Sequence, residues 1–147
     1  MAYNNFKYDV DADGIALVTW DIPGKSMNVF TQEVMEELNA ITDAVVADAA
    51  VKGVVFTSGK DSFSGGADLT MLKGMFEIYR KEKAKDPDKA VKILFEMTGK
   101  MTGLFRKIET SGKPWVSAIN GICMGGAFEL SLACHGRVVS DDPKVKM

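Results

Sequence analysis

The chain has 147 residues, of which 46% are hydrophobic and 26% charged, and this predicts one globular domain with a buried core. Its 18 basic and 20 acidic residues give a net charge of −2 without a basic run, which argues against nucleic acid or an acidic membrane surface as the partner. No apolar run approaches the roughly 20 residues of a membrane span, and residues 1–13 lack the apolar core of a signal peptide. Cys123 and Cys134 show neither disulfide nor zinc-ligand spacing, so we expect a reduced, cytoplasmic protein without a metal site.

The first predicted strand covers residues 15–20 and follows an Asp-Ala-Asp-Gly turn at 11–14. A loop of turn-forming residues occupies 21–28. Thr31 is a suitable N-cap for the next helix, because its hydroxyl can accept a hydrogen bond from the first turn. That helix has one apolar stripe, which indicates that it packs on a core. The stripe consists of Val34, Leu38, Ile41 and Val45.

A second strand is predicted at 53–57, and it leads into a Gly-rich loop at 58–69 that opens a helix. Helical character extends from about residue 68 to residue 110, and Pro87 divides it into two helices. We expect the charged segment 80–89 to be solvated surface, and most of the nine methionines to fill the core rather than line a ligand site. The second helix has a long amphipathic face made of Val91, Leu94, Phe95, Thr98, Met101, Phe105 and Ile108.

The same sequence of strand, Gly-rich turn and helix recurs farther along the chain. Residues 114–119 form an apolar run typical of a buried strand, 120–126 a Gly-rich turn and 127–134 a helix, followed by a short strand at 137–140. A strand-to-helix turn of this kind presents backbone N–H groups that have no partner within the helix. Glu129 lies in the first turn, where it either caps the helix or transfers a proton beside a bound anion.

Two Gly-rich turns in an alternating β-α pattern indicate a shared site. The carboxyl ends of parallel strands lie at one edge of a sheet, so the sequence predicts two sets of N–H donors side by side, with Glu129 near them. A site of this composition stabilises an oxyanion and moves a proton or a water molecule next to it. The predicted chemistry therefore takes place alpha or beta to a carbonyl group.

Other kinds of site fit the sequence less well. Gly121 and Gly126 have the spacing of a P-loop, but Ala127 and Phe128 stand where a P-loop carries Lys and Ser or Thr. No G-x-S-x-G nucleophile elbow occurs, and we assign the one histidine, His135, a structural or surface role. His, Cys and carboxylate residues show no metal-ligand spacing.

Three motifs carry a resemblance to a known family: FSGGADL at 63–69, KPWVSAING at 113–121 and MGGAFEL at 124–130. In this order they resemble the enoyl-CoA hydratase/isomerase (crotonase) family, and the resemblance covers essentially the whole chain. The segments 132–138 and 141–144 narrow it to the N-terminal hydratase/isomerase part of multifunctional fatty-acid oxidation α-subunits. In those proteins a 3-hydroxyacyl-CoA dehydrogenase part with an NAD site follows, and this chain lacks it.

The resemblance implies an α/β fold of the crotonase-like (β-β-α) spiral type, with an acyl-CoA thioester bound at the sheet edge. It implies hydration of 2-enoyl-CoA to 3-hydroxyacyl-CoA in fatty-acid β-oxidation. The thioester oxygen would lie between the backbone N–H groups of Ala67 and Gly126, and Glu129 would be the first of two catalytic glutamates. Further substrate contacts are implied at Lys25, Ser26, Met27, Gly65, Gly66, Asp68, Leu69 and Gly125.

The chain departs from the family pattern at its end. The family's second glutamate follows in a Gly-x-Pro-Glu segment, and the chain stops at Met147 before any such segment. We therefore expect residues 1–147 to be the N-terminal part of a domain that is incomplete at its C-terminus, with no cofactor in this chain. Δ3-Δ2 enoyl-CoA isomerisation and non-catalytic acyl-CoA binding remain alternative functions. The resemblance also implies a homo-oligomer, or an α/β complex with a thiolase, in the full-length protein.

Overall fold

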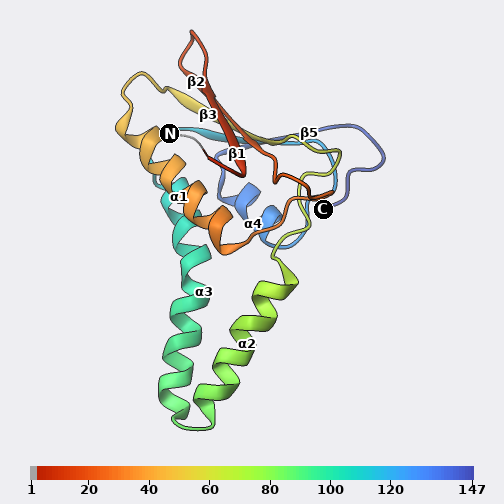
Figure 1. Ribbon diagram of the computed structural model, residues 1–147. Coiled ribbons are helices and arrows are strands. Elements are labelled where there is room, and N and C mark those ends of the chain that lie inside the picture. The colour runs from red at the N-terminus through yellow and green to blue at the C-terminus, as the bar shows by residue number, and fades with distance from the viewer. Residues whose placement is uncertain (1–2) are drawn as a thin grey trace.

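A computed structural model describes residues 3–147, which form five strands and four helices (Figure 1). In chain order they are β1 (Phe6–Val10), β2 (Ile15–Trp20), α1 (Gln32–Ala47), β3 (Gly53–Ser58), α2 (Leu69–Lys83), α3 (Pro87–Glu109), β4 (Trp115–Ile119), α4 (Gly126–Ala133) and β5 (Gly136–Val139). The predicted elements at 15–20, 53–57, 114–119, 127–134 and 137–140 are all present with boundaries that differ by at most one residue, and the helix predicted after Thr31 is α1.

The strands pair in sequence order, β1-β2-β3-β4-β5, to form one five-stranded sheet. β1 is antiparallel to β2, and the remaining pairs are parallel. The chain therefore winds in one direction, adding one strand after another to the same edge (Figure 1). Since β3 and β4 are parallel, their carboxyl ends lie at one edge, where the loops that follow them pair through Ser64 and Cys123. This confirms that the two Gly-rich turns meet.

The N-terminal segment contains a strand beyond those predicted. β1 carries Phe6, Tyr8 and Val10 in alternation, which is the strand signal within this otherwise polar segment. The predicted turn between β1 and β2 is confirmed. Asp11 accepts hydrogen bonds from the backbone N–H groups of Asp13 and Ile15, at 3.0 and 2.8 Å.

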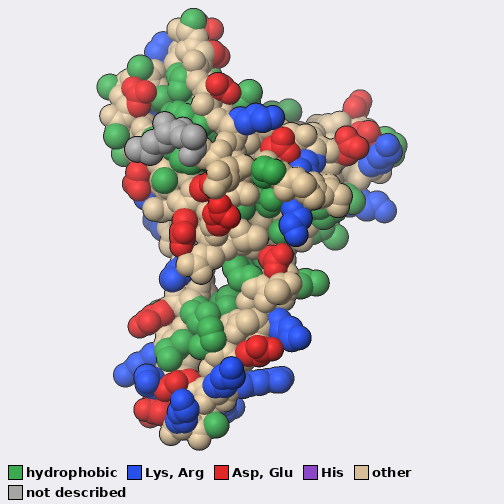
Figure 2. Space-filling view, viewed as in Figure 1, with side chains coloured by type: hydrophobic (Ala, Val, Ile, Leu, Met, Phe, Trp, Pro, Cys, Tyr) green, Lys and Arg blue, Asp and Glu red, His purple; other side chains and the backbone are tan. Residues whose placement is uncertain are grey.

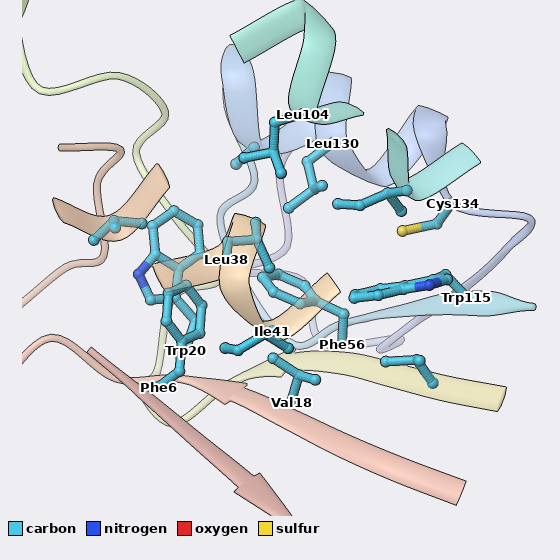
Figure 3. Close-up of a cluster of buried hydrophobic side chains, with 14 of the residues drawn as sticks. Phe6, Val18, Trp20, Leu38, Ile41, Phe56, Leu104, Trp115, Leu130 and Cys134 are labelled. Atoms are coloured by element: carbon cyan, nitrogen blue, oxygen red, sulfur yellow. The ribbon is translucent and has the colours of Figure 1, made fainter. Parts of the chain in front are cut away.

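The core lies between the sheet and the helices that cover one of its faces. Thr31 caps α1 as predicted, since its hydroxyl accepts a hydrogen bond from the N–H of Val34 at 3.2 Å. All four residues of the predicted α1 stripe are fully buried. Figure 3 shows Trp20, Phe56 and Trp115 between the strands and the helices. Burying aromatic and aliphatic side chains in this way contributes about 1.5–3 kcal/mol for each large side chain.

α2 and α3 form a helical hairpin that projects from the sheet layer (Figure 1). Pro87 is the first residue of α3 and separates the two helices, as predicted. The predicted amphipathic face of α3 is right only near its C-terminal end, where Phe105 and Ile108 are buried. Val91 and Phe95 are 58% and 76% exposed. The reason is geometric, because the first half of α3 extends past the sheet and α2 is its neighbouring helix there.

Side chains around β4 have structural roles. The N–H of Trp115 donates to Nδ1 of His135 at 3.1 Å, and the N–H of His135 donates to the carbonyl of Trp115 at 2.8 Å. His135 thus completes hydrogen bonding at the start of β4, which confirms its predicted structural role. Cys123 and Cys134 are free and buried, and burial raises the pKa of Cys134 to about 12.

A charged clamp joins the loop after β2 to the loop after β3. The Nζ of Lys60 donates to Oδ1 of Asp21 at 2.9 Å and to the carbonyl of Ile22 at 2.8 Å. Lys7 pairs with the other oxygen of Asp21 at 3.3 Å. The hydrogen bond from Lys60 holds the pKa of Asp21 below its usual value. The clamp fixes the two loops next to each other.

We expect Asp21→Asn to lower the unfolding free energy at neutral pH by less than about 1 kcal/mol, because solvent screens this partly exposed pair. The pKa of Asp21 is lower in the folded state, so the carboxylate stabilises the fold above its unfolded-state pKa. That contribution is lost as the pH falls through the folded-state pKa. Urea unfolding at a series of acidic pH values should show the difference between the two proteins shrinking.

The matched control is Asp9→Asn, on β1, since Asp9 forms no ion pair among residues 3–147. Its effect should be small at every pH. A stability difference for Asp21→Asn that stays constant on acidification would contradict the ion-pair explanation.

Candidate active site

The loop after β3 holds Ala67 by hydrogen bonds to the residues on either side of it. Phe30 donates its N–H to the carbonyl of Gly66 at 2.8 Å and accepts from the N–H of Asp68 at 3.0 Å. Asp68 in turn caps α2, because its carboxylate accepts from the N–H of Met71 at 2.9 Å. The N–H of Ala67 donates to no acceptor within residues 3–147. Ala67 therefore presents a backbone donor that is fixed in place and free to bind a ligand.

The turn after β4 presents a second free donor. Gly125 adopts φ +50° and precedes α4, whose first residue is Gly126. The N–H of Gly126 is one of the donors that a helix leaves without an intrahelical partner, and it has no acceptor in the described chain. One turn later, the N–H of Glu129 donates to the carbonyl of Gly125 at 3.0 Å, which places Glu129 on the first turn of the helix.

Close contact at Gly66 brings these two donors together. Gly66 adopts φ +88°, a conformation that other residues rarely take. A Cβ at this position would lie 2.7 Å from the carbonyl oxygen of Met124 and 3.3 Å from the nitrogen of Gly126. The residue before Ala67 therefore lies directly against the second turn. The structure brings together the donors that the sequence places on separate loops.

A cavity of about 180 Å³ lies between α2, α3 and the two turns. Ala67 and Glu129 both line it, and a Cβ at Gly126 would lie 3.3 Å from the sulfur of Met101 in its wall. Figure 2 shows hydrophobic side chains gathered between α2 and α3 on the face in view. The lining residues are Met35, Ala67, Met71, Leu72, Met75, Met97, Thr98, Met101, Thr102 and Glu129.

Five of the nine methionines line this cavity. Met35 and Met101 also pack against the core, as expected, whereas Met71, Met75 and Met97 are not part of it. Met71 and Met75 lie four residues apart on α2, and Met97 and Met101 have the same spacing on α3. The two pairs therefore face each other across the hairpin. In the sequence, this methionine wall of the cavity corresponds to two methionine pairs with four-residue spacing, one on each side of Pro87. Flexible thioether side chains make the wall apolar and adaptable in shape.

The loop at 21–28, which carries three of the implied substrate contacts, lies against the first turn. A Cβ at Gly65 would lie 2.7 Å from the sulfur of Met27, so the two loops are in contact there. Lys25 and Ser26 are exposed in the same loop. None of these four residues lines the cavity, and their predicted contacts with substrate stay predictions.

The remaining predicted contacts lie around the two turns. Gly125 provides the turn into α4, and the carboxylate of Asp68 is engaged as a helix cap. Leu69 is 80% exposed at the start of α2 and does not line the cavity. Asp68 and Gly125 therefore shape the backbone of the two turns, and substrate contact at these three residues stays a prediction.

Glu129 is the one carboxylate among the residues that line the cavity. Glu129 is exposed in the first turn of helix α4. Residues 3–147 contain no group of three or more His, Cys, Asp or Glu side chains placed to hold a metal ion. Within the same residues, no helix has the length and apolar character needed to cross a membrane.

Comparison with known proteins identifies the family. Residues 11–147 match the enoyl-CoA hydratase/isomerase family model. The chain is 39% identical over 143 residues to the fatty acid oxidation complex subunit alpha of Idiomarina loihiensis, covering 97% of this chain and 18% of that protein. It is 41% identical over 136 residues to the protein of the same name from Shewanella amazonensis, covering 92% of this chain and 17% of that protein.

Solved structures agree with this assignment. An enoyl-CoA hydratase/isomerase from Xanthobacter autotrophicus Py2 has a TM-score of 0.75 at 29% identity, covering 96% of this chain and 48% of that one. An enoyl-CoA hydratase from Bacillus anthracis, at 24% identity, shares the fold with a TM-score of 0.70, covering 92% of this chain and 47% of that one. These likenesses confirm the predicted crotonase-like α/β fold.

The chain belongs to the enoyl-CoA hydratase/isomerase family. It spans about half the length of these solved structures and less than a fifth of the curated relatives that it matches.

We expect Gly66→Ala to destabilise the protein by about 1–3 kcal/mol, because the new Cβ would clash with the Met124 carbonyl in a left-handed backbone conformation. Gly99→Ala is the matched control, since Gly99 lies within α3 with no atom close to its Cβ position. That change should stabilise the helix by roughly 0.5–1 kcal/mol. Urea unfolding of the three proteins measures both shifts. Equal effects at the two positions would show that the contact between the turns is not tight.

Proposed function

We propose that this chain binds an acyl-CoA thioester and supplies the oxyanion site of an enoyl-CoA hydratase. The reaction is the hydration of 2-enoyl-CoA to 3-hydroxyacyl-CoA in fatty-acid β-oxidation. The observation that supports it is the pair of N–H groups, at Ala67 and Gly126, that have no acceptor in the described chain and lie beside a cavity containing Glu129. Family membership and the names of the curated relatives support the same assignment.

The proposed reaction moves a water molecule and an electron pair. The thioester carbonyl accepts hydrogen bonds from both N–H groups while the water oxygen forms a bond to C3. The π electrons of the C2–C3 bond move toward the carbonyl, whose oxygen becomes an enolate oxyanion. The carbonyl re-forms as C2 takes a proton, so the elements of water end on C3 and C2. In a comparable oxyanion site, one donor lowers the activation free energy by about 2.7–4 kcal/mol.

Glu129 is the proposed acid-base group. Its carboxylate orients the attacking water and receives or returns a proton during the addition. It reaches the same cavity as Ala67, because α4 begins at the turn that carries the second donor. Water and protons are the only reagents in this scheme, so we propose that residues 1–147 use no organic cofactor and no metal.

Δ3-Δ2 enoyl-CoA isomerisation is the second candidate, and the single carboxylate in the cavity favours it. In that reaction one base removes a proton from C2 of a 3-enoyl thioester and returns a proton to C4, while the double bond moves into conjugation. The intermediate is a dienolate rather than the enolate of hydration, but in both the negative charge lies on the thioester oxygen, so the two N–H donors can serve both reactions. Hydration gains from a second acid, whereas isomerisation can proceed with one.

We further propose that these residues act within a longer protein. The chain covers 17–18% of relatives that are named as subunits of a fatty acid oxidation complex. An NAD site would belong to a dehydrogenase part outside residues 1–147, and the partners would be further copies of the chain or a thiolase. A cytoplasmic location also stays a prediction.

The test is Glu129→Gln in the protein at its natural full length. We expect hydration of crotonyl-CoA to fall by at least about 10²-fold, because general acid-base groups typically contribute 10²–10⁴-fold. Calorimetry should show that binding of a saturated acyl-CoA is retained. Glu109→Gln, an exposed carboxylate at the end of α3, is the matched control and should keep wild-type hydration.

Each other outcome has a defined meaning. Hydration that is unchanged in Glu129→Gln would remove this residue from the mechanism. Turnover of a 3-enoyl-CoA without hydration of the 2-enoyl isomer would select the isomerase. Binding of acyl-CoA without turnover of either thioester would leave a binding module.

A further inference from the structure

Ser64 is the residue through which the two Gly-rich turns are joined. Its N–H donates to the carbonyl of Ile122 at 2.8 Å, and its carbonyl accepts from the N–H of Met124 at 3.1 Å. These bonds form the short parallel bridge opposite Cys123. Ser64 is fully buried, so its main chain holds the second turn just ahead of Gly126 without competition from water.

The hydroxyl of Ser64 holds the first turn. It accepts a hydrogen bond from the N–H of Gly66 at 3.1 Å and donates to the carbonyl of Asn28 at 2.9 Å. Gly66 is the residue immediately before Ala67. Through its main chain and its side chain, one buried residue therefore contacts both of the segments that carry the free donors.

Asn28 provides a rigid anchor for that hydroxyl. Its amide side chain is fully buried and accepts from the N–H of Ile22 at 3.0 Å. The same amide donates to the carbonyl of Trp20 at 2.8 Å and to the hydroxyl of Ser58 at 2.9 Å. Bonds to the ends of β2 and β3 fix Asn28 to the sheet. Through Asn28, the sheet therefore holds Ser64 in place.

We propose that Ser64 is a positioning residue that sets the separation between the N–H donors of Ala67 and Gly126, with Asn28 as its anchor. The inference rests on the proposed function, in which those donors bind one thioester oxygen. Without the hydroxyl, the buried N–H of Gly66 loses its acceptor. The peptide unit between Gly65 and Gly66, one residue before the N–H donor of Ala67, then has one restraint fewer, while the main-chain bridge to the second turn stays in place. Ser64 touches no substrate in this scheme and acts through the backbone.

The first variant is Ser64→Ala, which removes the hydroxyl and keeps the main-chain bridge. We expect kcat for the thioester reaction to fall roughly tenfold, the effect of losing about one buried hydrogen bond in the transition state, with little change in KM.

A spectroscopic measurement separates the positioning role of Ser64 from an effect on overall stability. Infrared difference spectra of bound 2-enoyl-CoA report how strongly the donors polarise the thioester C=O. The wild-type protein should lower the C=O stretching frequency, and Ser64→Ala should lower it less.

Two further variants complete the experiment. Thr42→Val is the matched control, because Thr42 is a fully buried hydroxyl that donates to the Leu38 carbonyl within α1, away from both turns. It should keep the wild-type kcat and C=O shift, whatever its effect on stability. Ser64→Cys keeps a side chain of similar size with a weakly hydrogen-bonding thiol and should reduce both readouts. It also replaces Ser64→Ala if that variant does not fold.

The outcomes distinguish a failure of the proposed function from a failure of the positioning role of Ser64. If the wild-type protein neither shifts the C=O frequency nor turns over either enoyl-CoA isomer, the proposed function fails, and the role of Ser64 fails with it. If the wild-type protein shows the shift and both Ser64 variants retain the wild-type shift and kcat, the positioning role is wrong while the proposed function stands.

Discussion

The parallel pairing of β3 with β4 is the constraint on which the rest of the structure depends. Parallel strands require the chain to cross back over the sheet between them, and the α2–α3 hairpin is that connection. The same pairing places both strand ends at one edge, so that two loops far apart in sequence become neighbours. The hairpin starts two residues after Ala67, and its helices form the apolar wall beside the donors. The position of the candidate site and the α2–α3 connection thus both follow from the parallel pairing of β3 with β4.

Much of the fold can be predicted from local patterns in the sequence. The β-branched runs, the Thr31 cap and the break at Pro87 each depend on residues close together in the chain, and each is confirmed. The exposure of Phe95 could not be predicted in the same way. An amphipathic face shows that a helix can pack, but the extent of packing depends on where the helix passes the edge of the sheet. β1 is short and lies in a polar segment, which weakens its alternation signal.

The candidate site was predictable in outline for a similar reason. Gly-rich turns after strands indicate donors at a sheet edge, and the structure brings the two turns into contact at Gly66. The methionine wall was not predicted, because four-residue spacing is the same for a core and for a cavity. Only the distance between two helices decides between them. The role of the Ser64 hydroxyl depends on a partner on a third segment, Asn28, that no spacing rule connects to it.

The polarity of this site comes from the peptide backbone, and this has a consequence for how the protein tolerates change. Every residue except proline carries an N–H, so replacing the side chain at 67 or 126 does not by itself delete a donor. Systematic alanine substitution would therefore not detect the two backbone N–H groups that are proposed to bind the oxyanion. An inserted or deleted residue between Ser64 and Ala67 would instead move one donor away from the other. In this part of the chain, the number of residues is therefore constrained as well as the residue types at Ser64 and Gly66.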